Sequence, residues 1–380
     1  MDCEFAEEQK MFQTMVRDFV DQEIAPMAAR WEEEERFPYD VWKEMAALGI
    51  CGVALPREYG GNGGGKTLFC IATEEIARGS AGLAVAYLVG CGVAMENIVR
   101  YGTEEQKSNY VPRCCNGEIA YFALTEAVGG SDVALMQTRY TKEGDYYLLN
   151  GTKLFITNGE ESSFGVVYAT KNTSLGYRGI SCFIVEKSSP CFSVGKKEKK
   201  TGQHCSSTTE LVFDNCRIPV ANRVGEERRG FRMALEAIDA SRISIGAQAL
   251  GIAEAAYDAA VAYAKERKAF GKSLAQMQAI QWMISDMATD IDASRLLIYK
   301  AAWLQEQGKP FVKEAAMAKL FATEASSRVC HKAVQIFGGY GYSRDFAVER
   351  YARDQRVTEI YEGTSEMQRW AIARHTLGTK

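Results

Sequence analysis

One glutamate near the C-terminus, Glu362, has the surroundings of a catalytic base. Gly363 follows it and permits unusual backbone angles, and Thr364 or Ser365 can N-cap a helix that begins directly afterwards. Ser365 and Gln368 also have the spacing of a capping box. A carboxylate in such a turn is held firmly and can point into a cleft. Most acidic side chains are simply solvated, so the rest of the chain must decide between these two interpretations.

A second candidate is the glycine-rich loop that follows a predicted strand at residues 121–124. Residues 124–132 read Leu-Thr-Glu-Ala-Val-Gly-Gly-Ser-Asp. Consecutive glycines let backbone N–H groups approach a ligand closely, and Thr125 and Ser131 supply hydroxyl groups. Taken alone, the loop could equally be an ordinary turn.

Two more clusters lie in the C-terminal third. Residues 266–272, Glu-Arg-Lys-Ala-Phe-Gly-Lys, with Gln278 further on, offer a guanidinium for phosphate and an aromatic face for a ring. Residues 335–342, Gln-Ile-Phe-Gly-Gly-Tyr-Gly-Tyr, come shortly before the Glu362 turn. Any one cluster could arise by chance. The three in this order, around a β-rich segment between helical blocks, could not.

A further glycine-rich segment imitates a phosphate-binding loop. Residues 60–67 match G-x-x-x-x-G-K-[ST], which works only where a buried strand runs directly into the loop. Here residues 56–59 separate the loop from the apolar run at 50–55, and no alternating strands and helices follow. We therefore interpret this segment as a flexible surface turn.

Composition excludes several classes of function. The net charge of −4 argues against nucleic acid as a partner, because neutralising phosphates requires a basic face. No apolar run is seen to approach the roughly 20 residues of a membrane span. The acidic start of the chain lacks a signal-like region, so a cytoplasmic address is expected. The 11 cysteines are scattered and only three histidines are present, so we expect no metal site and reduced, mostly buried thiols.

The hydrophobic pattern predicts an α+β multidomain protein. Residues 1–117 read as an all-α N-terminal domain, with helical spacing at 7–30, 39–48, 67–77 and 83–101. Residues 118–225 read as a small β-domain, barrel or sandwich, with tight turns predicted at 142–145 and at Asn150-Gly151. The basic run at 196–200 is interpreted as a solvated hairpin, or less simply as a phosphate-binding patch. Residues 226–380 carry long helical patterns at 231–264, 277–306 and 313–337, typical of an antiparallel four-helix bundle.

At this point the chain resembles the acyl-CoA dehydrogenase family, over nearly all of its 380 residues. The motifs that carry the resemblance are the T-E-x-x-G-G-S-D loop, the E-R-x-x-F-G-K join, the Q-x-x-G-G-x-G-Y run and the I-Y-E-G-T turn. The resemblance, not composition or spacing, implies that FAD lies between the β-domain and the C-terminal bundle. It also implies an acyl-CoA substrate, an electron-transferring flavoprotein as acceptor, and a homo-oligomer, usually a tetramer.

The resemblance assigns roles to individual residues. Those implied to contact FAD within one subunit are Leu124, Thr125, Gly130, Ser131, Phe155, Thr157, Thr364 and Glu366. Those implied to reach the FAD of a neighbouring subunit are Arg267, Phe270, Gln278, Gln335 and Gly339. Those implied to lie at the acyl-CoA site are Ser131, Asp239, Arg242, Tyr361 and Gly363, with Glu362 as the base.

Some positions depart from the family pattern. Ala127 stands where the loop usually has proline, Leu135 replaces a small residue, and Phe155 replaces a common tryptophan. Some relatives place the base on the long helix, at the position of Ser241 here. A serine cannot act as that base, which strengthens the assignment to Glu362.

The implied reaction is α,β-dehydrogenation of a thioester. By resemblance, residues 81–91 line the far end of the acyl pocket, although a buried core helix explains each of them equally well. The segment holds no Arg, Lys or His, so a dicarboxylyl tail would bury an unpaired carboxylate. Tyr87 and Leu88 are expected to fill space there and to favour short, branched or small cyclic chains. Two alternatives stay open: an enoyl-CoA reductase that uses the same site in reverse, and a catalytically silent scaffold.

Overall fold

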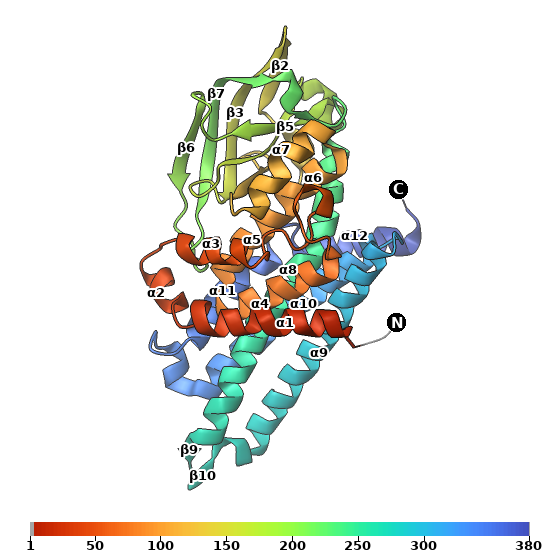
Figure 1. The fold of residues 1–380 in the computed structure, drawn as a ribbon. Helices are drawn as coiled ribbons and strands as arrows, with labels where there is room; N and C mark the ends of the chain where they lie inside the picture. Colours follow the sequence, from red (N-terminus) through yellow and green to blue (C-terminus); the bar gives the residue numbers. More distant parts are fainter. Residues whose placement is uncertain (1–3, 380) are drawn as a thin grey trace.

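The computed structural model describes residues 4–379, which form a helical block, a β-sheet and a second helical block in chain order. Figure 1 shows the sheet at one end of the molecule and the tip of the long helices at the other. The arrangement confirms the predicted fold class. The domain boundaries proposed above stay predictions.

The N-terminal block is all helical. Its helices are α1 (Glu7–Phe19), α2 (Ala28–Glu33), α3 (Tyr39–Ala47), α4 (Gly65–Gly79), α5 (Ala81–Tyr87), α6 (Ala94–Tyr101) and α7 (Glu104–Cys115). Two π-helical turns, η1 (Val20–Ile24) and η3 (Leu88–Val93), interrupt patterns that the sequence suggests are continuous. Apolar spacing alone does not reveal such turns, because it survives a one-residue widening of the helix.

The glycine-rich residues 60–64 lead into α4 from a short 3₁₀ turn, Arg57–Tyr59, and no described strand enters them. This placement agrees with the interpretation of the segment as a surface turn.

The middle block is one eight-stranded sheet in the order β6-β7-β3-β2-β4-β5-β8, with β1 paired in parallel to β4. Its strands are β1 (Ala120–Ala123), β2 (Arg139–Glu143), β3 (Tyr146–Thr157), β4 (Phe164–Thr170), β5 (Ile180–Glu186), β6 (Phe192–Lys197), β7 (Thr208–Pro219) and β8 (Arg223–Val224). Tyr147 on β3 packs against Phe183 on β5 with ring centroids 5.0 Å apart, although these strands are not neighbours. The sheet therefore curls around its own apolar core.

Three segments that the sequence predicts to be turns or hairpins can be compared with the sheet. The predicted hairpin at 142–145 is present, since Glu143 pairs with Tyr146 across it. The predicted turn at Asn150-Gly151 is wrong: both residues lie inside β3, at a register shift in its pairing with β7. Asn-Gly also suits a β-bulge, because glycine adopts the positive φ of 149° found at Gly151. The basic run at 196–200 is likewise not all loop, since Lys196 and Lys197 end β6.

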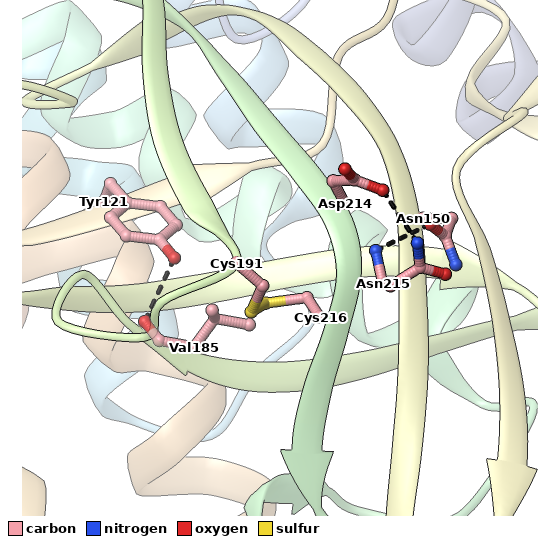
Figure 2. Close-up of a disulfide and its surroundings, with 7 residues drawn as sticks. All are labelled: Tyr121, Asn150, Val185, Cys191, Asp214, Asn215 and Cys216. Carbon is pink, nitrogen blue, oxygen red and sulfur yellow. Dashed lines mark hydrogen bonds between the residues drawn. A yellow bond between two sulfur atoms is a disulfide. The ribbon is translucent and has the colours of Figure 1, made fainter.

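One prediction about the cysteines is wrong. Cys191, just before β6, forms a disulfide with Cys216 on β7, and Figure 2 shows the bond beside the Tyr121–Val185 hydrogen bond. The two half-cystines are 25 residues apart in sequence, so only the β6–β7 pairing brings their Cα atoms to 4.8 Å. The other eight cysteines that the structure describes are free, and seven of these are buried.

The C-terminal block is built on long helices, as predicted. They are α8 (Gly230–Glu266), α9 (Gln278–Glu306) and α10 (Val312–Phe337), followed by α11 (Val348–Gln355) and α12 (Ser365–Leu377). A small hairpin, β9 (Lys268–Ala269) with β10 (Lys272–Ser273), joins α8 to α9. This hairpin lies at the end of the molecule opposite the sheet (Figure 1).

One helical stretch is long and apolar enough to cross a membrane, contrary to the sequence-based expectation. It runs over Ala81–Tyr101, and 83% of its apolar window is buried inside the protein. The π-helical turn joins α5 to α6 into this single run. Its burial is that of a core helix.

Candidate active site

The Glu362 turn lies between a 3₁₀ turn, η9 (Arg356–Glu359), and helix α12. Glu362 has a φ of 50° and Gly363 a φ of 93°, so two successive residues adopt left-handed backbone. Such a conformation is costly for a residue with a Cβ and persists only where neighbours hold it. Thr364 is the N-cap, and its side chain accepts a hydrogen bond from the Met367 N–H at 3.4 Å.

The capping box predicted for Ser365 and Gln368 is wrong. Ser365 is the first helical residue, and its buried hydroxyl has no hydrogen-bond partner among the described residues. Gln368 instead points back into the turn, where its amide Nε2 donates to the Gly363 carbonyl at 2.8 Å and to the Glu362 carbonyl at 3.4 Å. Gln368 therefore stabilises the turn rather than the helix end.

A residue that the sequence analysis missed, Lys319 on α10, reaches the same turn. Its side chain is fully buried, and its Nζ donates to the Gly363 carbonyl at 2.7 Å. The available signal was a lysine at an inward position of α10, among the buried residues Ala315, Ala316, Ala318 and Ala322. A buried lysine is uncommon unless it is paired.

The Glu362 carboxylate is half-buried and held from α8. Ser241 donates its hydroxyl to Glu362 Oε2 at 2.8 Å. Burial raises the pKa of Glu362, while the Ser241 hydrogen bond and the positive charges of Lys319, Arg242 and Lys66 oppose that rise. Ser241 therefore holds the carboxylate that the sequence analysis predicts to be the base.

Arg242 and Asp239, on the same helix, form an ion pair beside the turn. Arg242 Nη1 lies 2.6 Å from Asp239 Oδ1, and the Nε of the buried Arg242 has no described partner. Burial raises the pKa of Asp239, and the Arg242 charge opposes the rise. The Arg242 charge near Glu362 is therefore already partly neutralised by Asp239.

An apolar cluster adjoins the turn. Its buried members are Val85, Leu88, Val89, Val93, Ala237 and Ile245, with Phe122 and Tyr361 packed against them. Ala237, Ser241, Ile245 and Gln248 are three or four residues apart, so they share one face of α8. The hydrogen bond between Ser241 and Glu362 therefore lies on the same face of α8 as the apolar residues Ala237 and Ile245.

Gln248, the last residue of this row on α8, is linked to Tyr361. The Tyr361 hydroxyl donates to Gln248 Oε1, and Gln248 Nε2 donates to the Ala81 carbonyl at 3.0 Å. The expectation for Tyr87 is wrong: its ring stacks on Phe69 with centroids 4.8 Å apart, and its hydroxyl donates to the Ile50 carbonyl. Tyr87 thus points into the N-terminal core, whereas Leu88 does face the cluster.

A buried ion pair between Lys153 and Glu126 stabilises the glycine-rich loop. Lys153 Nζ lies 2.7 Å from Glu126 Oε1 and donates to the Leu124 carbonyl at 3.1 Å. Burial lowers the pKa of Lys153 to about 8 and the Glu126 charge opposes this. For Glu126, burial is outweighed by Lys153 and by backbone donors, and its pKa falls. This pair was not predicted.

The predicted flavin-side residues gather at the ends of β1 and β3. The Leu154 N–H donates to the Thr125 carbonyl at 2.9 Å, which places Phe155 and Thr157 beside the loop. Phe155 is 62% exposed with a φ of 56°, so its ring is held outward from the strand. Gly130 and Ser131 are exposed, and a Cβ at Gly130 would meet no atom within 4 Å. Ala127 and Leu135 are also exposed, which leaves this loop open to a ligand.

The second set of predicted residues lies elsewhere, around the β9–β10 hairpin and the end of α10. Arg267, Phe270, Gln278, Gln335 and Gly339 are all exposed. Phe270 is 97% exposed, and the Arg267 guanidinium lies 5.4 Å from the centre of the Tyr340 ring. Glu366, at the start of α12, is also exposed, and a backbone hydrogen bond lowers its pKa. The described residues contain no cluster of three or more potential metal ligands.

Comparison with known families matches three domain models. These are the acyl-CoA dehydrogenase N-terminal domain at residues 6–118, the middle domain at 121–216 and the C-terminal domain at 228–377. The chain belongs to the acyl-CoA dehydrogenase family.

Individual relatives are similar over their whole length. The short-chain specific acyl-CoA dehydrogenase of Clostridium acetobutylicum is 45% identical, over 98% of this chain and 99% of the relative. The acryloyl-CoA reductase (NADH) of Anaerotignum propionicum is 44% identical, over 99% and 96%. Among solved structures, butyryl-CoA dehydrogenase from Megasphaera elsdenii gives a TM-score of 0.97 at 40% identity, over 99% of this chain and 100% of that one. A chain in the structure of the electron transferring flavoprotein of Acidaminococcus fermentans gives 0.98 at 42% identity, over 99% and 100%.

Proposed function

We propose that the protein oxidises a short, branched or small cyclic apolar acyl-CoA to the 2-enoyl-CoA, with FAD as cofactor and Glu362 as the base. The observation that carries the proposal is the Glu362 carboxylate, half-buried, bonded to Ser241 and set beside an apolar cluster. A base so placed can reach the α-carbon of a thioester whose acyl chain lies along that cluster.

The surroundings of Glu362 increase the basicity of its carboxylate, which the proposed proton transfer requires. The α-proton of a thioester is far too weakly acidic for a carboxylate in water. Burial raises the pKa of Glu362 and so brings its basicity closer to the task. The backbone N–H of Glu362 donates to no described residue, so it is free to bond the thioester carbonyl as negative charge develops there.

The residues of the glycine-rich loop fit FAD. Phe155 offers an exposed apolar face, Thr125 and Thr157 offer hydroxyls, and the open backbone at Gly130 can approach a pyrophosphate. When bound, FAD would accept the β-hydrogen as hydride. Arg267 and Phe270 are too exposed to serve an internal site, which supports a shared site in a homo-oligomer, most simply a tetramer.

The preference for a small acyl group follows from the apolar face. Gln248 and Tyr361 close one end of it, and a longer chain would have to break their hydrogen bond. No member of the apolar cluster is charged, so a glutaryl tail would bury an unpaired carboxylate at a cost of several kcal/mol. Each methylene that fits contributes about 0.8 kcal/mol.

The partner and the direction also belong to the proposal. The similarity to a chain in the electron transferring flavoprotein structure supports that flavoprotein as the electron acceptor. The similarity to an acryloyl-CoA reductase favours a second candidate, reduction of an enoyl-CoA at the same site. A silent scaffold is disfavoured because Glu362, Arg267 and Thr125 are all present. A cytoplasmic address remains a prediction.

The test is anaerobic bleaching of the flavin by butyryl-, cyclohexanecarbonyl-, palmitoyl- and glutaryl-CoA. We expect butyryl- or cyclohexanecarbonyl-CoA to be most efficient. Glu362→Gln should retain flavin but bleach about 100- to 10,000-fold more slowly. Glu105→Gln, the same change at an exposed position of α7, is the control. Palmitoyl- or glutaryl-CoA as the best substrate would refute the pocket argument, and rapid bleaching by Glu362→Gln would refute the base.

A further inference from the structure

Lys319 is a fully buried ammonium with an unusual set of contacts. Its Nζ makes one hydrogen bond, to the Gly363 carbonyl at 2.7 Å. No carboxylate lies within 4 Å of it among the described residues. An ammonium has three donors and is expensive to bury without a charged partner. Burial therefore favours the neutral amine of Lys319, and a nearby negative charge favours its ammonium form.

The charged groups around Lys319 and Glu362 come from several elements. Those facing Lys319 are Glu362 in the turn, Arg242 on α8, Glu359 on η9 and Glu366 on α12. Those facing Glu362 are Lys319, Arg242 and Lys66, with the hydroxyls of Ser241, Tyr361 and Tyr168 also close. Of the groups facing Lys319, Glu362 has the largest charge effect, and Glu366 is exposed to solvent. Glu362 is thus the main counter-charge of Lys319.

We propose that Lys319 is a positioning residue for the base: it fixes the Glu362 turn through the Gly363 carbonyl, and its charge keeps Glu362 ionised until substrate arrives. The proposal rests on Glu362 being the base. Gln368 holds the same carbonyl at 2.8 Å without any charge, so the chain itself offers a variant that separates the two effects.

The charge effect has a definite sign. Burial lowers the pKa of Lys319 to about 7, and the nearby Glu362 carboxylate raises it. Each of these two charges therefore favours the charged form of the other group. Removing the positive charge makes the carboxylate harder to ionise, so Glu362 stays protonated, and inactive as a base, up to a higher pH.

The experiment follows the rate of anaerobic flavin bleaching by butyryl-CoA from about pH 5.5 to 9. For Lys319→Met we expect the acid limb of the profile to move up by about one pH unit. Its plateau rate should also fall about tenfold from loss of the hydrogen bond. Gln368→Met should lower the plateau without moving the limb. Lys332→Met, the same change at a surface position of α10, should do neither.

Flavin absorbance and the thermal midpoint of each variant show whether it is folded. If Lys319→Met does not fold, Lys319→Gln keeps an N–H donor and removes only the charge, and its limb should still move. The proposal is overturned if folded Lys319→Met or Lys319→Gln has the acid limb at the same pH as wild type. The base assignment itself survives that result as long as Glu362→Gln is inactive. Rapid bleaching by Glu362→Gln instead removes the base assignment on which the proposal rests.

Discussion

The Glu362 turn and the region around Arg267 differ in how many contacts their side chains make within one chain. At the turn, Ser241, Lys319 and Gln368 each make a hydrogen bond to residue 362 or 363 from inside the same molecule. Around the β9–β10 hairpin, the Arg267 guanidinium lies over the Tyr340 ring and makes no hydrogen bond to the described residues, and Phe270 is 97% exposed. We therefore propose that the Glu362 turn is positioned within one chain, whereas the cluster around Arg267 contacts a second molecule.

Substitutions at buried polar contacts within the chain should change its stability. Substitutions in the exposed part around Arg267 should change cofactor binding and leave the fold intact.

The largest effect is expected for Lys153→Met, which removes one partner of a buried ion pair inside the chain. Losing the ammonium leaves Glu126 buried without its counter-charge beneath the glycine-rich loop. Breaking a buried pair in this way destabilises a protein by about 3–5 kcal/mol. Urea unfolding of the purified variant measures it. Lys171→Met, at a surface pair with Glu227, is the control and should change stability by less than about 1 kcal/mol. Equal stability of the two variants would show that the pair is not structural.

An intermediate effect is expected for Asp354→Asn, which probes a buried contact between α11 and the loop before β7. Asp354 Oδ1 accepts the Gln203 N–H at 2.6 Å, and burial, together with the Glu32 charge, raises the pKa of Asp354 to about 7. The folded protein therefore binds a proton that the unfolded chain releases between about pH 4 and 7. As the pH rises through that range, the stability of wild type should fall relative to that of Asp354→Asn, which has no such proton.

Between pH 4 and pH 8 the stability of Asp354→Asn relative to wild type should therefore increase by about 4 kcal/mol. Thermal unfolding at several pH values measures it. A variant less stable than wild type at pH 8 would show that Asp354 is ionised and well compensated in the folded protein.

The smallest effect is expected for Arg267→Ala, in the exposed part. Loss of one charge-assisted hydrogen bond to a phosphate should weaken flavin retention about tenfold. The thermal midpoint of the flavin-free protein should stay unchanged. Dialysis followed by flavin absorbance measures retention, and Arg229→Ala is a matched surface control. A fully flavin-loaded monomer would contradict the shared site.

Much of the fold and part of the site could be predicted from local patterns. The spans of α8, α9 and α10 follow from sustained apolar spacing, and the Thr364 cap follows from residue type. Contacts made only by tertiary packing could not be predicted. Lys319 and Gln368 meet at one carbonyl from different helices, and Cys191 reaches Cys216 only through strand pairing. Tyr87 was misplaced because the sequence does not show which side of a fully buried helix faces the site.

The central claim is that one flavin site takes Glu362 from one chain and Arg267 from another. Co-expression of two differently tagged variants, Glu362→Gln and Arg267→Glu, tests it most directly. Each variant alone should bleach poorly with butyryl-CoA. In mixed oligomers isolated by both tags, random pairing leaves about a quarter of the sites with an intact base and an intact arginine. We therefore predict that activity returns to about a quarter of wild type in proportion to those sites. Activity no higher than that of the separate variants, in oligomers shown to be mixed, would contradict the shared site.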